Sequence, residues 1–213
     1  RVDRVVAHRW VEPFARERYL RGAEALRVPL KLYEGETLLP PGTLRTAAGD
    51  PFSVFTPFKR AFDVTAQIAP PLPAPRRLPA RPADATAHEA RLPTCASLGI
   101  EANARILRAG ESAARERLAS FVSASLDHYD RSRDQLSDET GTSRLSQDLK
   151  FGTLSARTVW HAATTPGAGA GVFRNELTWR EFTHSTLWDR PDVLEHPFPR
   201  EFAGFPWRDD VEG

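Results

Sequence analysis

The pattern that most constrains the fold is a strand, a helix and a second strand within residues 3–35. The run DRVVAH (3–8) predicts a short buried strand, and PLKLYEG (29–35) alternates like another. Between them, PFARERYLRGAEALR (13–27) predicts a helix that begins at Pro13, because proline suits the first helical position. Two strands joined by a helix run parallel. The chain is therefore expected to open with part of an α/β unit whose other strands lie upstream.

Charge and cysteine content exclude several classes of protein. Lysine and arginine (29) nearly balance aspartate and glutamate (28), so a nucleic-acid partner must be bound by a local patch rather than by net charge. The lone Cys95 excludes an intramolecular disulfide and a cysteine-based metal cluster. No apolar run approaches the roughly 18 residues of a membrane span. We expect a cytoplasmic protein without a metal site and without a membrane contact.

Composition divides the chain into three zones. Residues 1–62 form the α/β zone, which ends in aromatic residues that we expect to pack against a neighbouring domain. Residues 63–110 are proline-rich and predict an extended linker or, as an alternative, plain disorder. Residues 111–213 are predicted to be helical. The chain lacks methionine even at position 1 and stops soon after FPWRDD, so we expect an internal segment of a longer polypeptide.

Apolar spacing predicts the helices of the third zone. One amphipathic helix is predicted over residues 111–133, Ser155 is predicted to cap the next, and residues 162–173 read as a flexible loop of small residues. A further helix is predicted over 173–188. The two stripes are Ala114, Leu118, Phe121, Val122, Leu126 and Tyr129, and Phe173, Leu177, Phe182 and Leu187.

The stretch GTSRLSQDL (141–149) combines a glycine, hydroxyl groups and a guanidinium with the start of a helix. Free backbone N–H groups and a positive dipole end there can bind a phosphate or diphosphate. The alternative is that Thr142, Ser143 or Ser146 is simply a helix N-cap.

The helix over 173–188 carries a second polar cluster. Glu176, Trp179, Arg180 and Thr183 are three or four residues apart and therefore share a surface. The alternative makes Trp179 a core residue and Glu176 half of an ion pair with Arg180.

Several motifs in order resemble one family. GTSRLSQDLKFGTLSARTVW, NELTWREF and FPWRDD are similar to the flavin-binding helical domain of the DNA photolyase and cryptochrome family, and LLPPGTLRTAAGDPFSVFTPFKRAF to the end of its α/β antenna domain. The resemblance is strongest to bacterial class I cyclobutane pyrimidine dimer photolyases. It implies an α/β antenna part (1–62), a linker (63–110) and an all-α FAD-binding part (111–213), with both ends of the protein missing.

The resemblance assigns cofactor and DNA contacts. It implies that FAD is bound by Tyr129, Thr142, Ser143, Arg144, Leu145, Ser146, Phe173 and Arg180. It implies that damaged DNA is bound by Arg133, Asn175, Glu176, Trp179 and Thr183. Without the resemblance, Arg133 reads equally as an exposed charge. A second antenna chromophore, folate or deazaflavin, is also implied, and neither Trp10 nor Glu12 decides which.

The implied reaction is light-driven splitting of pyrimidine dimers in UV-damaged DNA by a monomer. Glu176 would donate a hydrogen bond to the dimer, for which it must be protonated, and Trp179 would pack on the dimer's rings. Trp207 would be the surface end of an electron-transfer chain, or else a surface aromatic in a turn. We expect the complete protein to be active and this segment alone to be inactive. The alternatives are a cryptochrome photoreceptor, a (6-4) photolyase or an unrelated nucleotide-binding α/β protein.

Overall fold

The N-terminal part is a parallel strand, helix and strand unit, as predicted. The computed structural model describes residues 2–78, 80, 92–101 and 103–206. Strand β1 (Val5–His8) and strand β2 (Leu30–Tyr33) pair in parallel, with Val5 opposite Leu30. Helix α1 (Pro13–Ala25) joins them and begins at the predicted proline. Strand β1 is not buried as predicted, because alternate side chains remain open, and Val6 is 57% exposed. Strand β2 alternates as predicted.

The aromatic residues after β2 form a helix that packs on the helical part of the chain. Helix α2 (Phe55–Thr65) buries Phe58 and Phe62. The Phe58 ring lies 5.3 Å from the ring of Phe182 in helix α7 (Ala168–Asp189). These side chains join one core with the buried residues of the third zone. The expected packing of these aromatics against a neighbouring unit is therefore present.

The third zone is helical, but its first helix is shorter than predicted. Helix α3 (Glu111–Ala124) ends before a 3-10 turn, η3 (Leu126–His128), which is followed by the short helix α4 (Tyr129–Ser132). Helices α5 (Ser146–Phe151) and α6 (Ala156–Ala162) follow. The Ser155 hydroxyl accepts a hydrogen bond from the Thr158 amide, which confirms it as the cap of α6.

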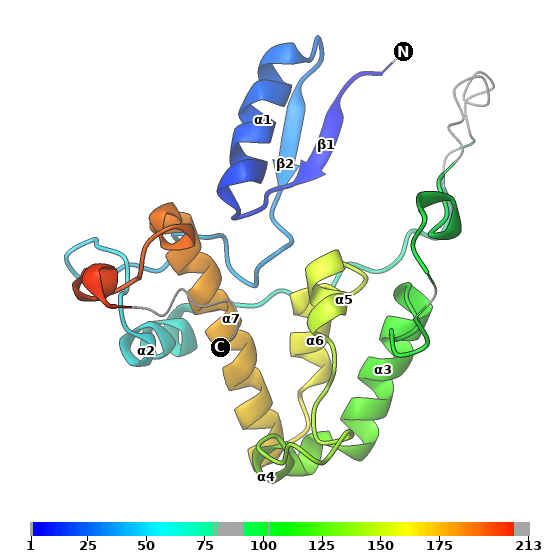
Figure 1. Ribbon diagram of the computed structural model, residues 1–213, viewed down its shortest axis with the longest axis vertical. Coiled ribbons are helices and arrows are strands. Elements are labelled where there is room, and N and C mark those ends of the chain that lie inside the picture. The colour runs from blue at the N-terminus through cyan, green and yellow to red at the C-terminus, as the bar shows by residue number, and fades with distance from the viewer. Residues whose placement is uncertain (1, 79, 81–91, 102, 207–213) are drawn as a thin grey trace.

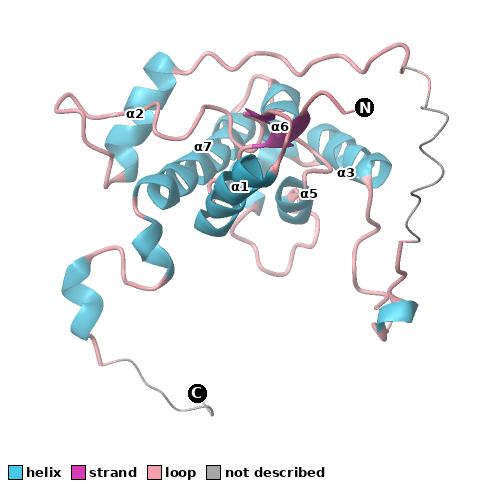
Figure 2. Cartoon of the chain, turned by 90° about the horizontal axis from the view of Figure 1, so that it is seen from above, coloured by secondary structure: helices cyan, strands magenta, loops and turns pink. Residues whose placement is uncertain are grey.

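Helix α7 is the central element of the molecule. It starts at Ala168, so residues predicted as the end of a flexible loop form its first turn, and Gly169 and Ala170 are buried there. In both views α7 lies between α2 on one side and α5, α6 and α3 on the other (Figures 1 and 2). The small residues allow close packing rather than flexibility, because the backbone of η3 lies directly against Gly169.

Further short 3-10 turns are η2 (Ala96–Leu98), η4 (Pro191–Leu194) and η5 (Arg200–Gly204).

The end of α7 is bonded to the N-terminal part. Arg45 makes a two-pronged ion pair with Asp189, with nitrogen to oxygen distances of 2.9 and 2.8 Å. Arg16 donates to the Trp188 carbonyl at 3.0 Å and stacks over its indole. These contacts fix the α/β unit above the C-terminal half of α7 (Figure 1).

Candidate functional site

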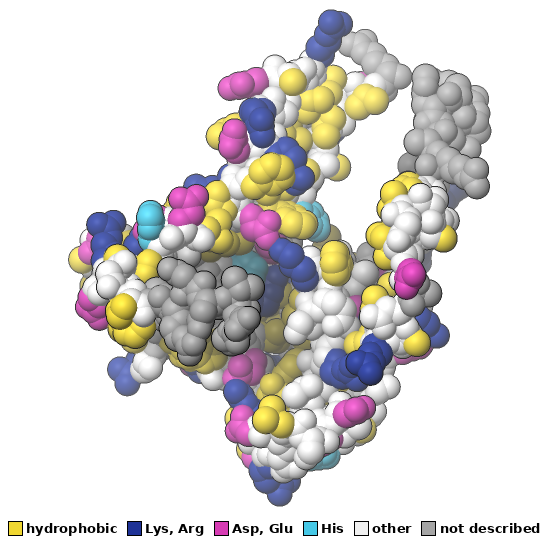
Figure 3. Space-filling model, viewed as in Figure 1, with side chains coloured by type: hydrophobic (Ala, Val, Ile, Leu, Met, Phe, Trp, Pro, Cys, Tyr) yellow, Lys and Arg dark blue, Asp and Glu magenta, His cyan; other side chains and the backbone are white. Residues whose placement is uncertain are grey.

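An open cleft of about 740 Å³ lies between α7, the loop before α5 and the loops that follow both strands. The face shown in Figure 3 is hollowed there. Its volume falls within the roughly 300–1,000 Å³ of typical small-molecule and cofactor sites. The residues proposed from sequence that line it are Tyr129, Thr142, Ser143, Arg144, Leu145, Ser146, Phe173, Glu176, Arg180 and Thr183. The fold thus brings all eight residues proposed for the cofactor to one cavity.

The loop before α5 presents unpaired polar groups. The N-cap of α5 is Leu145, and no side chain caps the helix. Within the described part of the chain, the hydroxyls of Thr142, Ser143 and Ser146 have no protein hydrogen-bond partner. The interpretation of these hydroxyls as helix caps is therefore wrong. They are free to bind a ligand.

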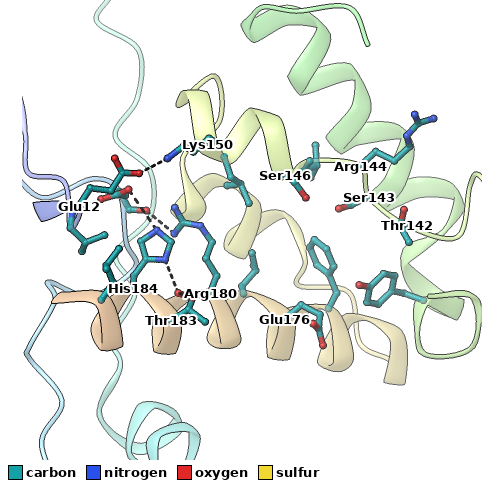
Figure 4. Close-up of a pocket in the computed structure, with 18 residues that line it drawn as sticks. Glu12, Thr142, Ser143, Arg144, Ser146, Lys150, Glu176, Arg180, Thr183 and His184 are labelled. Carbon is teal, nitrogen blue, oxygen red and sulfur yellow. Dashed lines mark hydrogen bonds and ion pairs between the residues drawn. The ribbon is translucent and has the colours of Figure 1, made fainter. Parts of the chain in front are cut away.

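The backbone of this loop has an uncommon conformation. Arg144 has a φ of 51°, in the left-handed region, and Leu145 follows with φ −94° and ψ 3°. A left-handed residue followed by a right-handed one turns successive N–H groups toward the same side and creates an anion-binding concavity. Because α5 spans six residues, these N–H groups matter more than its dipole. The Arg144 guanidinium extends away from α7 (Figure 4).

Another part of the cleft wall, close to this loop, is aromatic. Tyr129 is 8% exposed and Phe173 is 5% exposed, and their rings meet edge to face with centroids 5.3 Å apart. Phe121 of α3 backs both rings, at 5.6 Å from Tyr129 and 4.7 Å from Phe173. Burial raises the pKa of the Tyr129 hydroxyl. The cleft therefore joins an apolar, rigid wall to a polar loop, which suits a ligand with a flat ring system and an anionic part.

Arg180 supplies positive charge from α7. Its Nη1 donates to the Glu36 carbonyl at 2.8 Å and lies 3.6 Å from Oε1 of Glu181. Burial lowers the pKa of Arg180, and the charges of Glu181 and Glu36 oppose that effect. The other guanidinium nitrogens have no hydrogen-bond partner among the described residues. They remain available to an anionic ligand.

The α/β unit also contributes to the cleft, which the residue patterns did not predict. Glu12 and Glu36 line it, and Glu12 forms an ion pair with Lys150 of α5 (Figure 4). His184 of α7 lies beside Glu36, with Nε2 3.6 Å from Oε1. Both glutamates follow the carboxyl ends of adjacent parallel strands, which is where open α/β sheets bind ligands. The positions of Glu12 and Glu36 just after the two predicted strands could therefore have indicated from sequence that they line a ligand site.

Glu176 is paired with Arg133 and not with Arg180. The Arg133 guanidinium, from the end of α4, donates to the Glu176 carboxylate, which is 32% exposed. The hydrogen bond to Glu176 is the main cause of a raised pKa of Arg133. The Glu176 side chain is therefore partly exposed, and its carboxylate accepts a hydrogen bond. Donating a hydrogen bond to a substrate requires this ion pair to open.

Trp179 lies outside the cleft lining. Its indole stacks on Phe55 of α2, with ring centroids 3.5 Å apart and an interplanar angle of 9°, and it remains 41% exposed. It is therefore no core residue, and its proposed contact with a substrate stays a prediction. Asn175 is half-buried beyond the lining, and Trp207 lies outside the described residues.

The described residues contain neither a candidate metal site nor a candidate membrane-spanning helix. No group of histidine, cysteine, aspartate or glutamate side chains there is arranged to hold a metal ion. No helix in the same residues has the length and apolar character needed to cross a bilayer.

Comparison with known proteins identifies relatives of this chain. The DNA photolyase family profile matches residues 1–76. A deoxyribodipyrimidine photo-lyase of Thermus thermophilus is 37% identical over 199 residues, which cover 93% of this chain and 43% of that protein. A cryptochrome DASH of Gloeobacter violaceus is 29% identical over 211 residues, covering 92% of this chain and 42% of that protein.

Solved structures agree with the sequence matches. A bacterial class III photolyase from Agrobacterium tumefaciens superposes with a TM-score of 0.77 and 27% identity, over 98% of this chain and 45% of that one. The chain thus spans somewhat less than half the length of these relatives. The sequence matches and this superposition together show that the chain belongs to the DNA photolyase and cryptochrome family.

Proposed function

We propose that the full-length protein containing this chain is a deoxyribodipyrimidine photolyase that holds FAD in the cleft and splits cyclobutane pyrimidine dimers in UV-damaged DNA. The observation that carries the proposal is the meeting of all eight proposed cofactor residues at one cavity. Relatives named deoxyribodipyrimidine photo-lyase at 30% to 37% identity support the reaction class.

The residues of the cleft fit the chemical parts of FAD. A diphosphate needs several hydrogen-bond donors, and the loop 142–146 offers hydroxyls and N–H groups without protein partners. A flat ring system needs a rigid apolar wall, which Tyr129 and Phe173 supply. When bound and reduced, FAD would supply the photoexcited electron that opens the dimer. The chain's own residues would bind the FAD, orient it and shield it from solvent.

Arg133 and Glu176 connect DNA binding to the substrate site. In this proposal a DNA phosphate competes for the Arg133 guanidinium, which now donates to Glu176. Loss of this partner releases the Glu176 carboxyl toward a lesion that is flipped out of the duplex. Thr183, whose hydroxyl donates to the Arg180 carbonyl at 2.9 Å, lines the same side of the cleft.

Other parts of the proposal concern the whole protein. We propose an antenna part at 1–62, a linker at 63–110 and a flavin-binding part at 111–213, although α2 shares its core with α7. The protein is proposed to act as a monomer and to carry a second chromophore, folate or deazaflavin. The similarity to cryptochrome DASH favours one other candidate, a blue-light photoreceptor.

A repair assay tests the proposal. The full-length protein with reduced flavin is mixed with a thymine-dimer oligonucleotide, and the recovery of thymine absorbance is followed under blue light. We expect recovery that needs light and that falls steeply in Glu176→Ala, while the exposed control Glu139→Ala repairs like the wild type. Flavin that is bound without any repair would instead favour the photoreceptor or a (6-4) enzyme, which a second lesion distinguishes.

A further inference from the structure

The arginine of the cleft is held by the α/β unit. Nη1 of Arg180 donates to the backbone carbonyl of Glu36, a residue 144 positions earlier in the loop after β2, at 2.8 Å. This is the one protein hydrogen bond of the Arg180 guanidinium among the described residues. The direction of this partly buried cation therefore depends on where that loop is fixed.

The Glu36 side chain fixes the loop from within. Oε2 accepts a hydrogen bond from the Val11 amide at 2.8 Å, and Oε1 lies 3.6 Å from Nε2 of His184. The His184 Nδ1 is 2.8 Å from the Arg180 carbonyl, one turn earlier in α7. Burial raises the pKa of Glu36, but the bonds from His184 and Val11 outweigh it and the pKa is lowered. A charged Glu36 thus connects the loop after β1, the loop after β2 and α7.

Glu181 holds the same loop from the other side. Its Oε2 accepts from the Leu38 amide at 2.8 Å and from the Leu39 amide at 3.2 Å. Glu181 is 4% exposed, and its Oε1 has no hydrogen bond but faces Arg180. Residues 36–39 are therefore bonded at both ends to the turn of α7 that carries the arginine.

We infer that Glu36 is a positioning residue for Arg180, and that Glu36, Glu181 and His184 form a polar clamp that aims this guanidinium into the cleft. The inference rests on the proposed FAD site. The clamp explains why the partly buried guanidinium of Arg180 has one protein acceptor, while its other nitrogens have no hydrogen-bond partner among the described residues. The α/β unit thereby affects flavin affinity through Arg180.

A double-mutant cycle on flavin affinity tests the clamp in the full-length protein. Glu36→Ala and Arg180→Gln are made singly and together, and the flavin Kd of each is measured by fluorescence quenching. We expect Glu36→Ala to raise Kd about five- to tenfold, the size of one lost hydrogen bond. In the Arg180→Gln background the same change should raise Kd at most about twofold, because the group it positions is gone.

The outcomes separate the clamp from the flavin site itself. Equal effects of Glu36→Ala in both backgrounds would mean that Glu36 touches the ligand or supports the fold generally, and would overturn the inference alone. A wild-type protein without flavin affinity would overturn both proposals. Glu34→Ala is the matched control, because Glu34 lies in the same loop as Glu36 but pairs with Arg9 of the loop after β1, and its loss should leave Kd unchanged. If Glu36→Ala does not fold, Glu36→Gln keeps the acceptor for Val11 and is measured in the same cycle.

Discussion

Two glycines in the first turns of α7 should respond oppositely to alanine. A Cβ on Gly169 would lie 1.9 Å from the Leu126 carbonyl oxygen and 2.9 Å from the Asp127 carbonyl, both backbone atoms that cannot rotate away. Since real Cβ contacts essentially never fall below 3.0 Å, α7 and η3 would have to separate by roughly 1 Å. A Cβ on Gly171 meets nothing within 4 Å.

The magnitudes follow from packing and helix propensity. Alanine in a helix gains up to about 1 kcal/mol over glycine, which Gly171→Ala should show in full. Overpacking costs about 1–3 kcal/mol and more where backbone must move, so Gly169→Ala should lose about 3 kcal/mol net. For a chain of this size that loss corresponds to a Tm roughly 6–12 °C lower. Thermal denaturation followed by circular dichroism measures both variants.

Gly169→Ala should also alter the geometry of the cleft. Leu126 and Asp127 come three and two residues before Tyr129, and Gly169 lies one turn before Phe173, so the clash separates the two rings of the apolar wall. We therefore expect weaker flavin binding by Gly169→Ala and unchanged binding by Gly171→Ala. Tm values of the two variants within about 2 °C of each other would refute the close approach on which this reasoning depends.

Other substitutions test other contacts. Asp148→Asn should lower the free energy of unfolding, measured by chemical denaturation, by about 2–3 kcal/mol, because it breaks the nearly buried two-pronged ion pair with Arg117. Glu111→Gln breaks an exposed pair with Arg115 and should lower it by less than about 0.5 kcal/mol. Arg133→Ala should reduce the slope of log affinity for DNA against log salt by about 1, and an unchanged slope would make Arg133 an ordinary surface charge. Ser146→Ala and Arg144→Ala should each weaken flavin retention in an equilibrium dialysis experiment, and retention equal to wild type would remove them from the site.

Local patterns predicted the elements that depend on local physics. Pro13 starts α1, Ser155 caps α6, and the strand, helix and strand unit is parallel. The loop 142–146, which lines the cleft, was also singled out from its residues, because a run of hydroxyls and N–H groups needs partners wherever it lies.

Contacts between distant segments were not predictable in the same way. No proline or glycine ends α3 at Ala124, and the break lies where the Leu126 carbonyl meets Gly169 of α7. Trp179 was grouped with Glu176 from spacing alone, yet three residues turn a helix by about 300°, which places the indole beside the cleft. It then stacks on Phe55, a partner that no local pattern indicates.

The hydrogen bond between Arg180 and Glu36 and the ion pair between Lys150 and Glu12 join residues 144 and 138 positions apart. A cleft closed by such contacts exists only when the N-terminal unit is docked on the helices. Any ligand of the cleft therefore binds the docked state selectively and stabilises it by mass action. At a ligand concentration a hundred times Kd the gain is about 2.7 kcal/mol. If flavin is this ligand, as proposed, its supply in the cell sets how much of this protein is in the docked state.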